Sequence, residues 1–553
     1  MERNIEFVAY TDVSGGLQLN SNPFGLEINQ SPYMVNTDIT NKGFFPRGGY
    51  QFQKALPDWV NITEIFDYYY KGEYSWIAVS YPYILKINPY NFSYSVLYKK
   101  WYSNGKPRAA QSPTTIMLVD GINKPLQITG NTVVEVAWPQ QLTNDNNDAG
   151  APGELGNIVN SPFSTRADQR PADFGPINNV LYINDRFQVT ETKYGNIVIF
   201  SRWDDYTDFA TNAPADYDIA FFVQLPTPYP VTGWEVLNNE YVVIYLTNGY
   251  IVQSGKQPPG EGYQEPLLSW SVRDSINGCI SNNLIQKNSD GDQFYITSRN
   301  RVFTLKSSEN FNQAKTEGLS EDISIALKKY TKSMWEKTFF INNHTEGELL
   351  MFTPKDQHDG YMQQCFVYKY SGSIPSWTYE SDWGSSFRMT CAHLNLETGQ
   401  VFVVNQGNRI CLVGKGTRFD TEPVRTVVEL RPELFNNPVA NKEVLGVMLA
   451  VTNYTSGTIY YRAKWDSGEE TLEKFNFTDK VSLEDLREYL NNTESNILSD
   501  IGKPLEILFK PIKNKNGQIL RQRIETVNEQ DVGINLIAVV YRENNLAPYA
   551  KKQ

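Results

Sequence analysis

Short runs of aromatic and β-branched residues alternate with turn residues along most of the 553-residue chain. Between residues 66 and 100 this pattern predicts four consecutive strands, at residues 66–70, 74–81, 83–88 and 93–100. Turn residues such as Gly72 and Pro82 separate them. Four strands joined by short turns have about the size of one blade of a β-propeller.

Strand groups of the same kind recur along the chain. They lie at residues 115–138, 181–201, 234–253, 293–306, 349–370 and 400–413. The spacing is quasi-regular although the sequence repeat is weak, and it predicts an all-β fold. We expect a β-propeller-like body at residues 60–415, an extended N-terminal strap at residues 1–59 and a C-terminal β-rich module at residues 416–553.

Two kinds of segment depart from the strand pattern. Residues 143–176 are rich in Asn, Asp, Gly, Pro and Ala and have little hydrophobic periodicity, which predicts a long surface excursion within the body. Only a few short helices are expected. Ser320 is placed to cap a helix from residue 321 to about residue 332, and Ser482 to cap one at residues 483–491.

The composition indicates a folded protein and argues against tight binding of nucleic acid. Hydrophobic residues make up 40% of the chain and aromatic residues 13%, which is enough apolar surface for a sizeable core. The net charge is −12, and no dense run of Lys and Arg is present to grip phosphates. Loose passage of DNA along a weakly repulsive wall is compatible with this charge.

The cysteines and the N-terminus bear on the compartment. Cys279, Cys365, Cys391 and Cys411 show no CxxC spacing, and residues 1–6 lack the apolar core of a signal peptide. We therefore expect synthesis in a reducing cytoplasm. No run of about 18 apolar residues occurs, so no membrane span is expected.

Residues that could carry catalysis are scarce. The chain has three histidines, and none lies in a nucleophile-elbow or phosphate-loop context. The sequence therefore predicts a protein that is not an enzyme and that needs no cofactor. The segment at residues 414–417 lacks the spacing of a phosphate loop and is interpreted as a hairpin turn.

Three clusters contain metal-ligating residue types, and each has a simpler interpretation. Asp356, His358 and Asp359 are expected to form a polar hairpin tip. Cys391 and His393 share one face of a predicted strand without further zinc ligands, which favours core packing of the thiol. The loop at residues 145–148 has calcium-loop character but lacks the glutamate that would complete such a site. No metal site is predicted.

The first 50 residues carry an ordered set of glycines and polar residues. Its members are Gly15, Gly16, Leu17, Asn20, Pro23, Glu27, Gln30, Asn36, Asp38, Gly43, Pro46, Arg47, Gly48, Gly49 and Tyr50. This set resembles the N-terminal signature of phage tail propeller proteins, in which a similar segment precedes the blades. The glycines permit tight chain reversals, and the polar side chains can hold an extended strap through bonds to the backbone.

Further similarities to that family follow in the same order. They include Arg186, Ser201, Asp205 and Phe209, then Gly278, and finally Asp420, Lys442 and Asp466. Together the motifs span nearly the whole chain, which resembles the tail nozzle or tail-tube propellers of short-tailed phages, including packaged-DNA stabilisation proteins and proteins like tail tubular protein B. Residues 144–150, residues 334–360 and the expected helix after Ser482 have no counterpart in this pattern.

The resemblance implies a structural protein of the virion tail that is made in the host bacterial cytoplasm. Six copies would form a ring between the portal or adaptor and the distal tail, contact other tail proteins, and serve as conduit and gate for DNA ejection. The genomic DNA would pass through the lumen without sequence-specific binding. The motif residues would have a structural role, and none of them is expected to be catalytic, to ligate a metal or to bind a cofactor.

A second interpretation is a carbohydrate-binding or glycan-cleaving propeller adhesin at the tail tip. Asp204, Asp205 and Asp208 could act as paired carboxylates on a glycan. Three acids within five residues are more often a solvated turn, and no second acidic motif stands opposite them. The ordered N-terminal signature favours the ring-forming conduit.

Overall fold

The computed structural model describes most of the chain. The described residues are 5–10, 12–40, 43–102, 105–136, 138, 175–203, 205–206, 209, 221–237, 241–256, 268–288, 290–306, 315–372, 374–381, 383–384, 387–435, 440–452, 457–466, 468, 470–482, 485, 506–512, 516–528 and 532–544. The predicted surface excursion at residues 143–176 and the helix expected after Ser482 lie almost entirely outside these residues.

Seven groups of four antiparallel strands form the larger body of the described chain, and we number them as blades from β8 onward. Five are separate sheets, and the last two belong to one larger sheet that continues into the C-terminal module. Blades 1 to 3 are β8 (Glu64–Tyr70), β9 (Glu73–Ser80), β10 (Tyr83–Ile87), β11 (Tyr94–Tyr98); β12 (Arg108–Gln111), β13 (Ile116–Val119), β14 (Leu126–Thr129), β15 (Thr132–Glu135); and β16 (Ile177–Ile183), β17 (Arg186–Glu191), β18 (Ile197–Phe200), β19 (Phe221–Gln224).

Blades 4 to 6 are β20 (Val231–Leu237), β21 (Tyr241–Leu246), β22 (Tyr250–Ser254), β23 (Ser269–Asp274); β24 (Ile285–Lys287), β25 (Gln293–Ile296), β26 (Val302–Lys306), β27 (Lys315–Gly318); and β28 (Phe339–Asn343), β29 (Glu348–Thr353), β30 (Gln364–Lys369), β31 (Ser376–Glu380). Blade 7 is β32 (Met389–Leu394), β33 (Val401–Asn405), β34 (Arg409–Val413) and β7 (Tyr50–Ala55).

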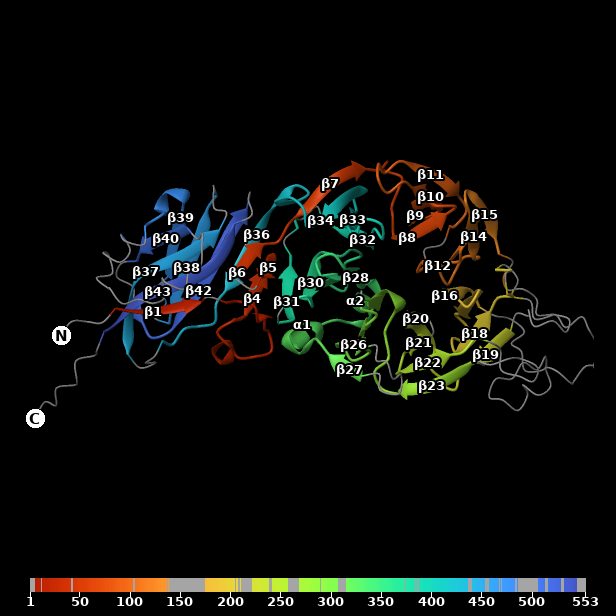
Figure 1. Ribbon diagram of the computed structural model, residues 1–553, viewed down its shortest axis with the longest axis horizontal. Coiled ribbons are helices and arrows are strands. Elements are labelled where there is room, and N and C mark those ends of the chain that lie inside the picture. The colour runs from red at the N-terminus through yellow and green to blue at the C-terminus, as the bar shows by residue number, and fades with distance from the viewer. Residues whose placement is uncertain are drawn as a thin grey trace, which may run out of the picture.

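The blades are arranged radially around an axis, as Figure 1 shows for the right-hand body. The first strand of a blade packs on the first strand of a neighbouring blade, as β20 does on β24 and β28 on β32. This is a seven-bladed β-propeller, so the predicted all-β, propeller-like fold is confirmed. The sequence pattern placed most second and third strands correctly but left out several first strands, such as β12.

Burial on both faces explains why the middle strands are largely apolar. In β9, Trp76 packs with Phe402 of blade 7, whereas the next residue, Ile77, packs with Leu118 of blade 2. Alternate side chains of one strand thus enter two different inter-blade cores, because successive side chains point to opposite faces of a sheet. Each blade is thereby held by apolar contact with both neighbours.

The ring is closed by the N-terminal part of the chain. β7 pairs antiparallel with β34 and so completes blade 7 with three strands from residues 389–413. The predicted hairpin at residues 414–417 is wrong, because β34 and the next strand, β35 (Arg418–Phe419), pair with opposite sides of β7 instead of with each other. The loop between them passes around the start of β7.

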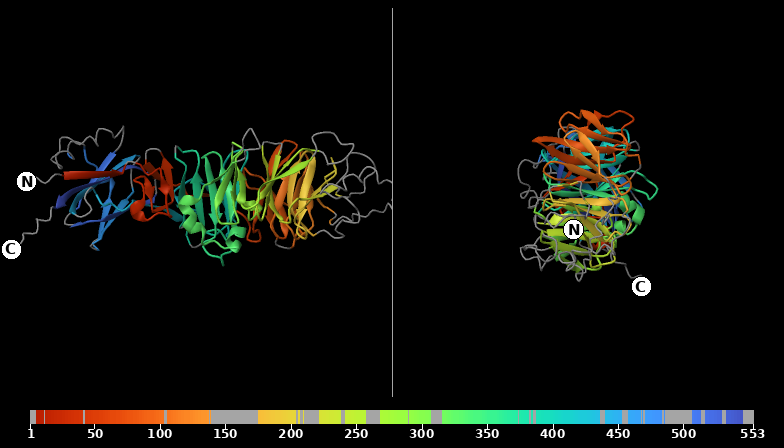
Figure 2. Two further views of the ribbon diagram at one scale, coloured as in Figure 1. Left: turned by 90° about the horizontal axis from the view of Figure 1, so that it is seen from below. Right: turned by 90° about the vertical axis from the view of Figure 1, so that its right-hand side faces the viewer.

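The C-terminal module is a β-sandwich that also takes strands from the N-terminal segment. One sheet has the order β40 (Glu506–Pro511), β37 (Asn441–Thr452), β43 (Gly533–Asn544), β6 (Gly43–Pro46), β5 (Thr37–Thr40), with β1 (Ile5–Tyr10) on β43 and β41 (Asn516–Gly517) on β37. The other has β39 (Glu470–Phe475), β38 (Ile459–Trp465), β42 (Leu520–Asn528), β36 (Glu422–Glu429) and β4 (Tyr33–Val35). Figures 1 and 2 show this sandwich beside the propeller.

Hydrogen-bonded strands run from the propeller into the sandwich. β4 pairs with β31 of blade 6 on one side and with β36 of the sandwich on the other. The short strand β35 likewise pairs with β7 and with β36. A parallel pair, β2 (Gly16–Leu17) and β3 (Gln30–Ser31), lies in the same N-terminal segment.

The described helices are short. They are η1 (Pro23–Gly25), η4 (Asn282–Leu284), η6 (Glu321–Ile323), α1 (Ser324–Leu327), α2 (Lys332–Lys337) and η7 (Phe477–Asp479). The single helix expected after Ser320 is instead η6, α1 and α2, and the expected cap is wrong because the Ser320 hydroxyl accepts a hydrogen bond from the backbone N–H of Val302 (3.0 Å). Within the described residues, no helix is both long and apolar enough to cross a bilayer.

Replacing Trp76 by alanine should destabilise the propeller. Trp76 is fully buried between blades 1 and 7, so Trp76→Ala is expected to lower the free energy of unfolding by about 3–5 kcal/mol. Trp59→Ala is the control, because the Trp59 side chain is 47% exposed. Chemical denaturation of both variants checks this, and equal losses for the two would contradict the assigned packing.

Candidate functional site at the junction of propeller and sandwich

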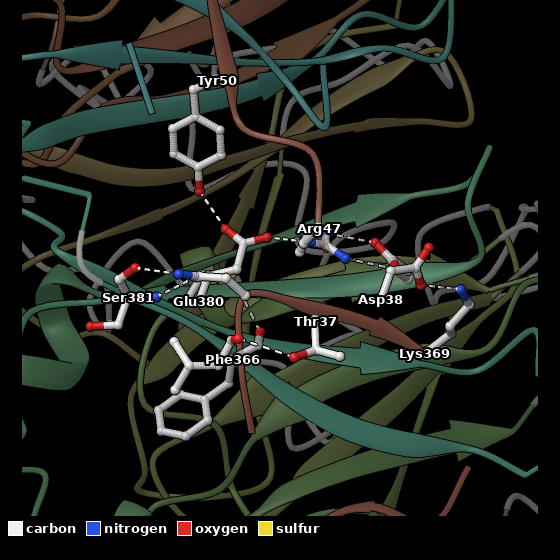
Figure 3. Close-up of polar contacts among 12 residues, drawn as sticks. Thr37, Asp38, Arg47, Tyr50, Phe366, Lys369, Glu380 and Ser381 are labelled. Carbon is white, nitrogen blue, oxygen red and sulfur yellow. Dashed lines mark hydrogen bonds and ion pairs between the residues drawn. The ribbon is translucent and has the colours of Figure 1, made fainter. Parts of the chain in front are cut away.

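A buried network of charged side chains lies where blade 6, blade 7 and the sandwich meet, and we call this region the junction. Arg47, just before β7, donates hydrogen bonds to both carboxylate oxygens of Glu348 on β29 (2.9 and 2.7 Å). It also donates to Glu380 on β31, whose second oxygen accepts a hydrogen bond from the Tyr50 hydroxyl (2.6 Å). Figure 3 shows Arg47 and Tyr50 converging on the Glu380 carboxylate.

Burial sets the electrostatics of this network. All four side chains are at most 7% exposed. Burial by itself lowers the pKa of Arg47. The negative charges of Glu348 and Glu380 have a larger combined effect, so the pKa of Arg47 lies above its ordinary value. Burial, together with Glu380, raises the pKa of Tyr50 well above its ordinary value. Arg47 is therefore a permanent cation and Tyr50 a permanent donor, which suits a structural lock.

Asn36 provides a second link across the junction. Its backbone is left-handed (φ 53°), and its side-chain amide donates to the carbonyl oxygens of Ser381 (3.0 Å) and Arg425 (2.8 Å). The amide oxygen of Asn36 accepts from the backbone N–H of Ser381 (3.0 Å). One fully buried side chain thus joins the end of β31 in the propeller to β36 in the sandwich.

Asp38 and the glycines complete the contacts. Lys369 on β30 donates to the Asp38 carboxylate (2.6 Å), as Figure 3 shows. Gly49 lies where a β-carbon would come within 2.0 Å of the Arg418 carbonyl oxygen, and at Gly43 one would come within 2.2 Å of the Ile534 carbonyl oxygen. Only glycine allows the N-terminal segment to pass so close to the backbone of the C-terminal module.

The other N-terminal motif residues lie next to the junction. Gly16 is in close contact with the backbone of Trp377 on β31. The Asn20 amide donates to the Ser324 hydroxyl (2.8 Å) and its oxygen accepts from the N–H of Ile325 (3.0 Å), which ties the segment to α1. Gly15 donates its N–H to the Asn29 carbonyl (3.1 Å), and Pro23 begins η1.

The later motif residues divide between the junction and more distant places. Asp420 belongs to the junction, because its N–H donates to the Tyr50 carbonyl (3.0 Å) and its carboxylate accepts from Arg409 (2.6 Å). Lys442, within the sandwich, donates to the Leu434 carbonyl (3.1 Å), and burial lowers its pKa. Asp466 accepts from the N–H of Gln518 (3.1 Å) in the same module.

The remaining motif residues lie in the propeller, away from the junction. In blade 3 the guanidinium of Arg186 donates to the Ser201 carbonyl (2.6 Å), and the Ser201 hydroxyl accepts from the N–H of Phe187 (3.0 Å). Phe209 is fully buried and packs edge-on against Trp138, and Asp205 is exposed in the same region. Gly278 closely approaches the backbone at Leu246, between blades 4 and 5.

Sequence reasoning missed the carboxylates on which the junction depends. Glu348 and Glu380 lie 301 and 333 residues from Arg47 in the chain and are single acids in otherwise ordinary strands. No local sequence pattern marks these two glutamates, although Glu348 begins β29 and Glu380 ends β31. Unlike them, Arg47 and Tyr50 stood out through the ordered N-terminal motif.

A cavity of about 340 Å³ lies among the first strands of the blades, and we call it the axial cavity. It is lined by side chains of β8, β12, β20, β24, β28 and β32, including Glu64 and Arg108. Burial raises the pKa of Glu64 to about 7, an effect that Arg108 partly opposes. The cavity is far too small for duplex DNA, whose major groove alone is about 12 Å wide.

The described residues offer little for metal or thiol chemistry. They contain no group of three or more His, Cys, Asp or Glu side chains placed to hold a metal ion. Cys391 is buried in the core between blades 1 and 7, as predicted for a packing thiol, and burial raises its pKa. His393 contacts Asp67 (3.1 Å) and stands edge-on to Trp76. His358 is exposed in the loop between β29 and β30.

Comparison with known proteins gives similarity of fold alone. No protein-family model and no curated protein sequence matches the chain. Among solved structures the chain is similar to YCF48 bound to D1 peptide (9% identity, TM-score 0.36, 66% of this chain and 97% of that chain). It is also similar to YCF48 from Cyanidioschyzon merolae (7%, 0.37, 66% and 99%) and to the C-terminal WD40 domain of Sif2 (8%, 0.33, 66% and 99%). Similarity this low carries no argument about what the chain binds.

Breaking the junction should cost far more stability than breaking a surface ion pair. Arg47→Met leaves the buried carboxylates of Glu348 and Glu380 without their cation, so a loss of about 3–5 kcal/mol is expected. Arg301→Met is the matched control, because Arg301 and Glu321 form an exposed pair whose loss should cost less than about 1 kcal/mol. Urea denaturation measures both, and similar losses would show that the network is not a lock.

Glu64 should make the folded state sensitive to pH. Because burial raises its folded-state pKa from 4.5 to about 7, the folded protein binds more protons than the unfolded chain between these pH values. This group's contribution to stability is therefore complete below about pH 4.5 and is lost as the pH rises through about 7. Glu64→Gln should gain stability relative to the parent protein between pH 5 and pH 8 in urea denaturation. Parallel pH profiles for the two proteins would refute the assignment.

Proposed function

We propose that this chain is a structural subunit of the tail of a short-tailed phage. Copies of it, six by the resemblance, form a closed ring that joins the portal or adaptor to the distal tail. The ring serves as conduit and gate during DNA ejection. The observation that carries the proposal is that residues of the resembling N-terminal motif meet at the junction. Asn36 joins blade 6 to the sandwich, whereas Arg47 and Tyr50 bond to the carboxylates of blade 6.

A ring subunit has to hold its parts in a fixed relation. Closed cyclic assembly repeats one heterologous contact, so a subunit whose two bodies moved freely would not close the ring reproducibly. In this chain β4 and β35 continue the hydrogen bonding from the propeller into the sandwich, and the buried side chains of the junction reinforce that link. This construction supports a role in a rigid assembly.

The propeller also has few free strand edges, which suits a protein that is surrounded by neighbouring subunits. Radial packing leaves each blade with only a short outer edge, and in blade 6 that edge is covered, since β31 pairs with β4. Exposed loops remain for contacts with neighbouring subunits, the adaptor and other tail proteins. These contacts are part of the proposal.

The path of the DNA in this proposal lies between subunits. The axial cavity of about 340 Å³ cannot hold a duplex, so the lumen has to be formed by the ring as a whole. The net charge of −12 fits such a lumen, because a neutral or negative wall does not retain phosphates that have to slide past. The role requires no catalysis and no cofactor.

Particles that lack this protein should carry incomplete tails. A stop codon in place of Trp76 ends the chain within blade 1 and removes the protein from assembling particles. Electron microscopy is expected to show particles that have portals but lack the distal tail. These particles should be non-infectious, with leakage of packaged DNA as a second defect.

A matched control and the purified protein sharpen this test. Particles made with Trp59→Phe, a change at an exposed aromatic position, should have complete tails. Negative-stain images should show an added ring when the purified chain is mixed with the connector. Complete tails on particles that lack the chain, with only attachment to cells lost, would replace the conduit by an adhesin at the tail tip.

A further inference from the structure

The outer face of the sandwich carries a positively charged groove, although the chain as a whole is acidic. The groove has a volume of about 480 Å³ and lies along β38, β39 and β42, at the left of Figure 1, with Pro23 and Pro32 at its side. Four basic side chains line this sandwich groove, namely Arg462, Lys464, Arg521 and Arg523, against the two carboxylates of Glu429 and Glu470.

The basic side chains stand directly opposite one another on neighbouring strands. In the pairing of β38 with β42, Arg462 lies opposite Arg523 and Lys464 lies opposite Arg521. Like charges in direct cross-strand positions destabilise a sheet. Glu525 contacts both Arg462 and Arg523 and offsets the first repulsion, so the repulsion that a negatively charged partner would relieve is the one between Lys464 and Arg521.

The chain itself neutralises this charge only in part. The Glu525 carboxylate, which is 6% exposed, lies 3.9 Å from Arg462 and 3.6 Å from Arg523. Lys464 pairs with Glu470 (2.9 Å) and Arg523 with Glu429 (3.6 Å), and in these last two pairs the side chains are substantially exposed. Exposed pairs of this kind contribute little to stability. Arg521 is exposed and makes no ion pair within 4.0 Å with any residue that the structure describes.

The spacing of the cations matches that of an extended peptide. Arg462 and Lys464 are two residues apart on one strand and so project from the same face at an interval of about 6.6 Å. Alternate side chains of an extended partner strand repeat at the same interval. Carboxylates at every second position of such a segment can therefore meet successive cations of the groove.

The remaining lining favours a peptide over nucleic acid. Glu429 and Glu470 would repel a phosphate backbone. No aromatic ring is among the described residues that line the groove, and the neighbouring Tyr33 ring already has the Arg523 guanidinium over it (5.7 Å), so unpaired bases would find little stacking surface. Leu472, which is 54% exposed, and the prolines offer aliphatic surface instead. An acidic peptide with aliphatic side chains complements both features.

We propose that the sandwich groove is a binding site for an extended acidic peptide segment of a partner protein. Its cations bind the carboxylates of the segment, and Leu472 and the prolines contact its aliphatic side chains. The site stands on the described sandwich alone and does not require that the chain forms a ring. It gives the module a means of recognising a neighbour by charge.

The probe is a fluorescein-labelled peptide with glutamate at alternate positions and valine between them, and its counterpart has lysine in place of glutamate. Fluorescence anisotropy with the full-length protein should show binding of the glutamate peptide that weakens with added salt, and no binding of the lysine peptide. Arg521→Glu should weaken binding about tenfold, and Arg521→Gln should weaken it less.

Stability provides the internal control. Arg521→Glu places a carboxylate opposite Lys464, so its melting temperature should be equal to or above that of the parent protein while its affinity falls. Lys54→Glu, an exposed cation on β7 outside the groove, should leave the affinity unchanged. Failure to bind the glutamate peptide, equal binding by Arg521→Glu, or tighter binding of a labelled 20-base-pair duplex that Arg521→Glu abolishes would each overturn the proposal.

Discussion

The pairing of the buried Arg47 guanidinium with Glu348 and Glu380 is the constraint on which the two-body structure depends. Taking these charges out of water costs free energy, and their mutual attraction offsets that cost only when both carboxylates are in place. The network therefore selects one arrangement of the N-terminal segment against blade 6. Because that segment continues into β7, the same arrangement determines how the propeller is closed.

Three structural consequences follow from one short stretch of chain. The segment from Asn36 to Tyr50 supplies β5 and β6 to the sandwich, carries Arg47 into the junction and then begins β7. Asn36 links the two bodies on one side of the network and Asp420 does so on the other. A change in this stretch therefore acts on blade 7, blade 6 and the sandwich together, which is the behaviour that the proposed ring subunit would need.

The sequence predicted the type of fold better than its closure. Strands buried on both faces, such as β9, are recognisable because they contain an uninterrupted apolar run, here residues 76–79. The ring closure by β7 was not foreseen, because most residues of its strand YQFQKA are exposed and its partner lies more than 350 residues away in the chain. The loop at residues 414–417 was misinterpreted for the same reason, since only the position of β7 explains its path.

Only the N-terminal residues of the junction could be predicted from the sequence. Its N-terminal members form an ordered motif, whereas Glu348 and Glu380 acquire their role through tertiary contact alone. A cryo-EM map of the intact phage tail tests the proposed ring most directly. We expect a closed ring of this chain around the tail axis, with propeller and sandwich in the relation described and the lumen between subunits. A map that placed the chain as a separate spike at the tail tip, or with the two bodies detached, would contradict this expectation.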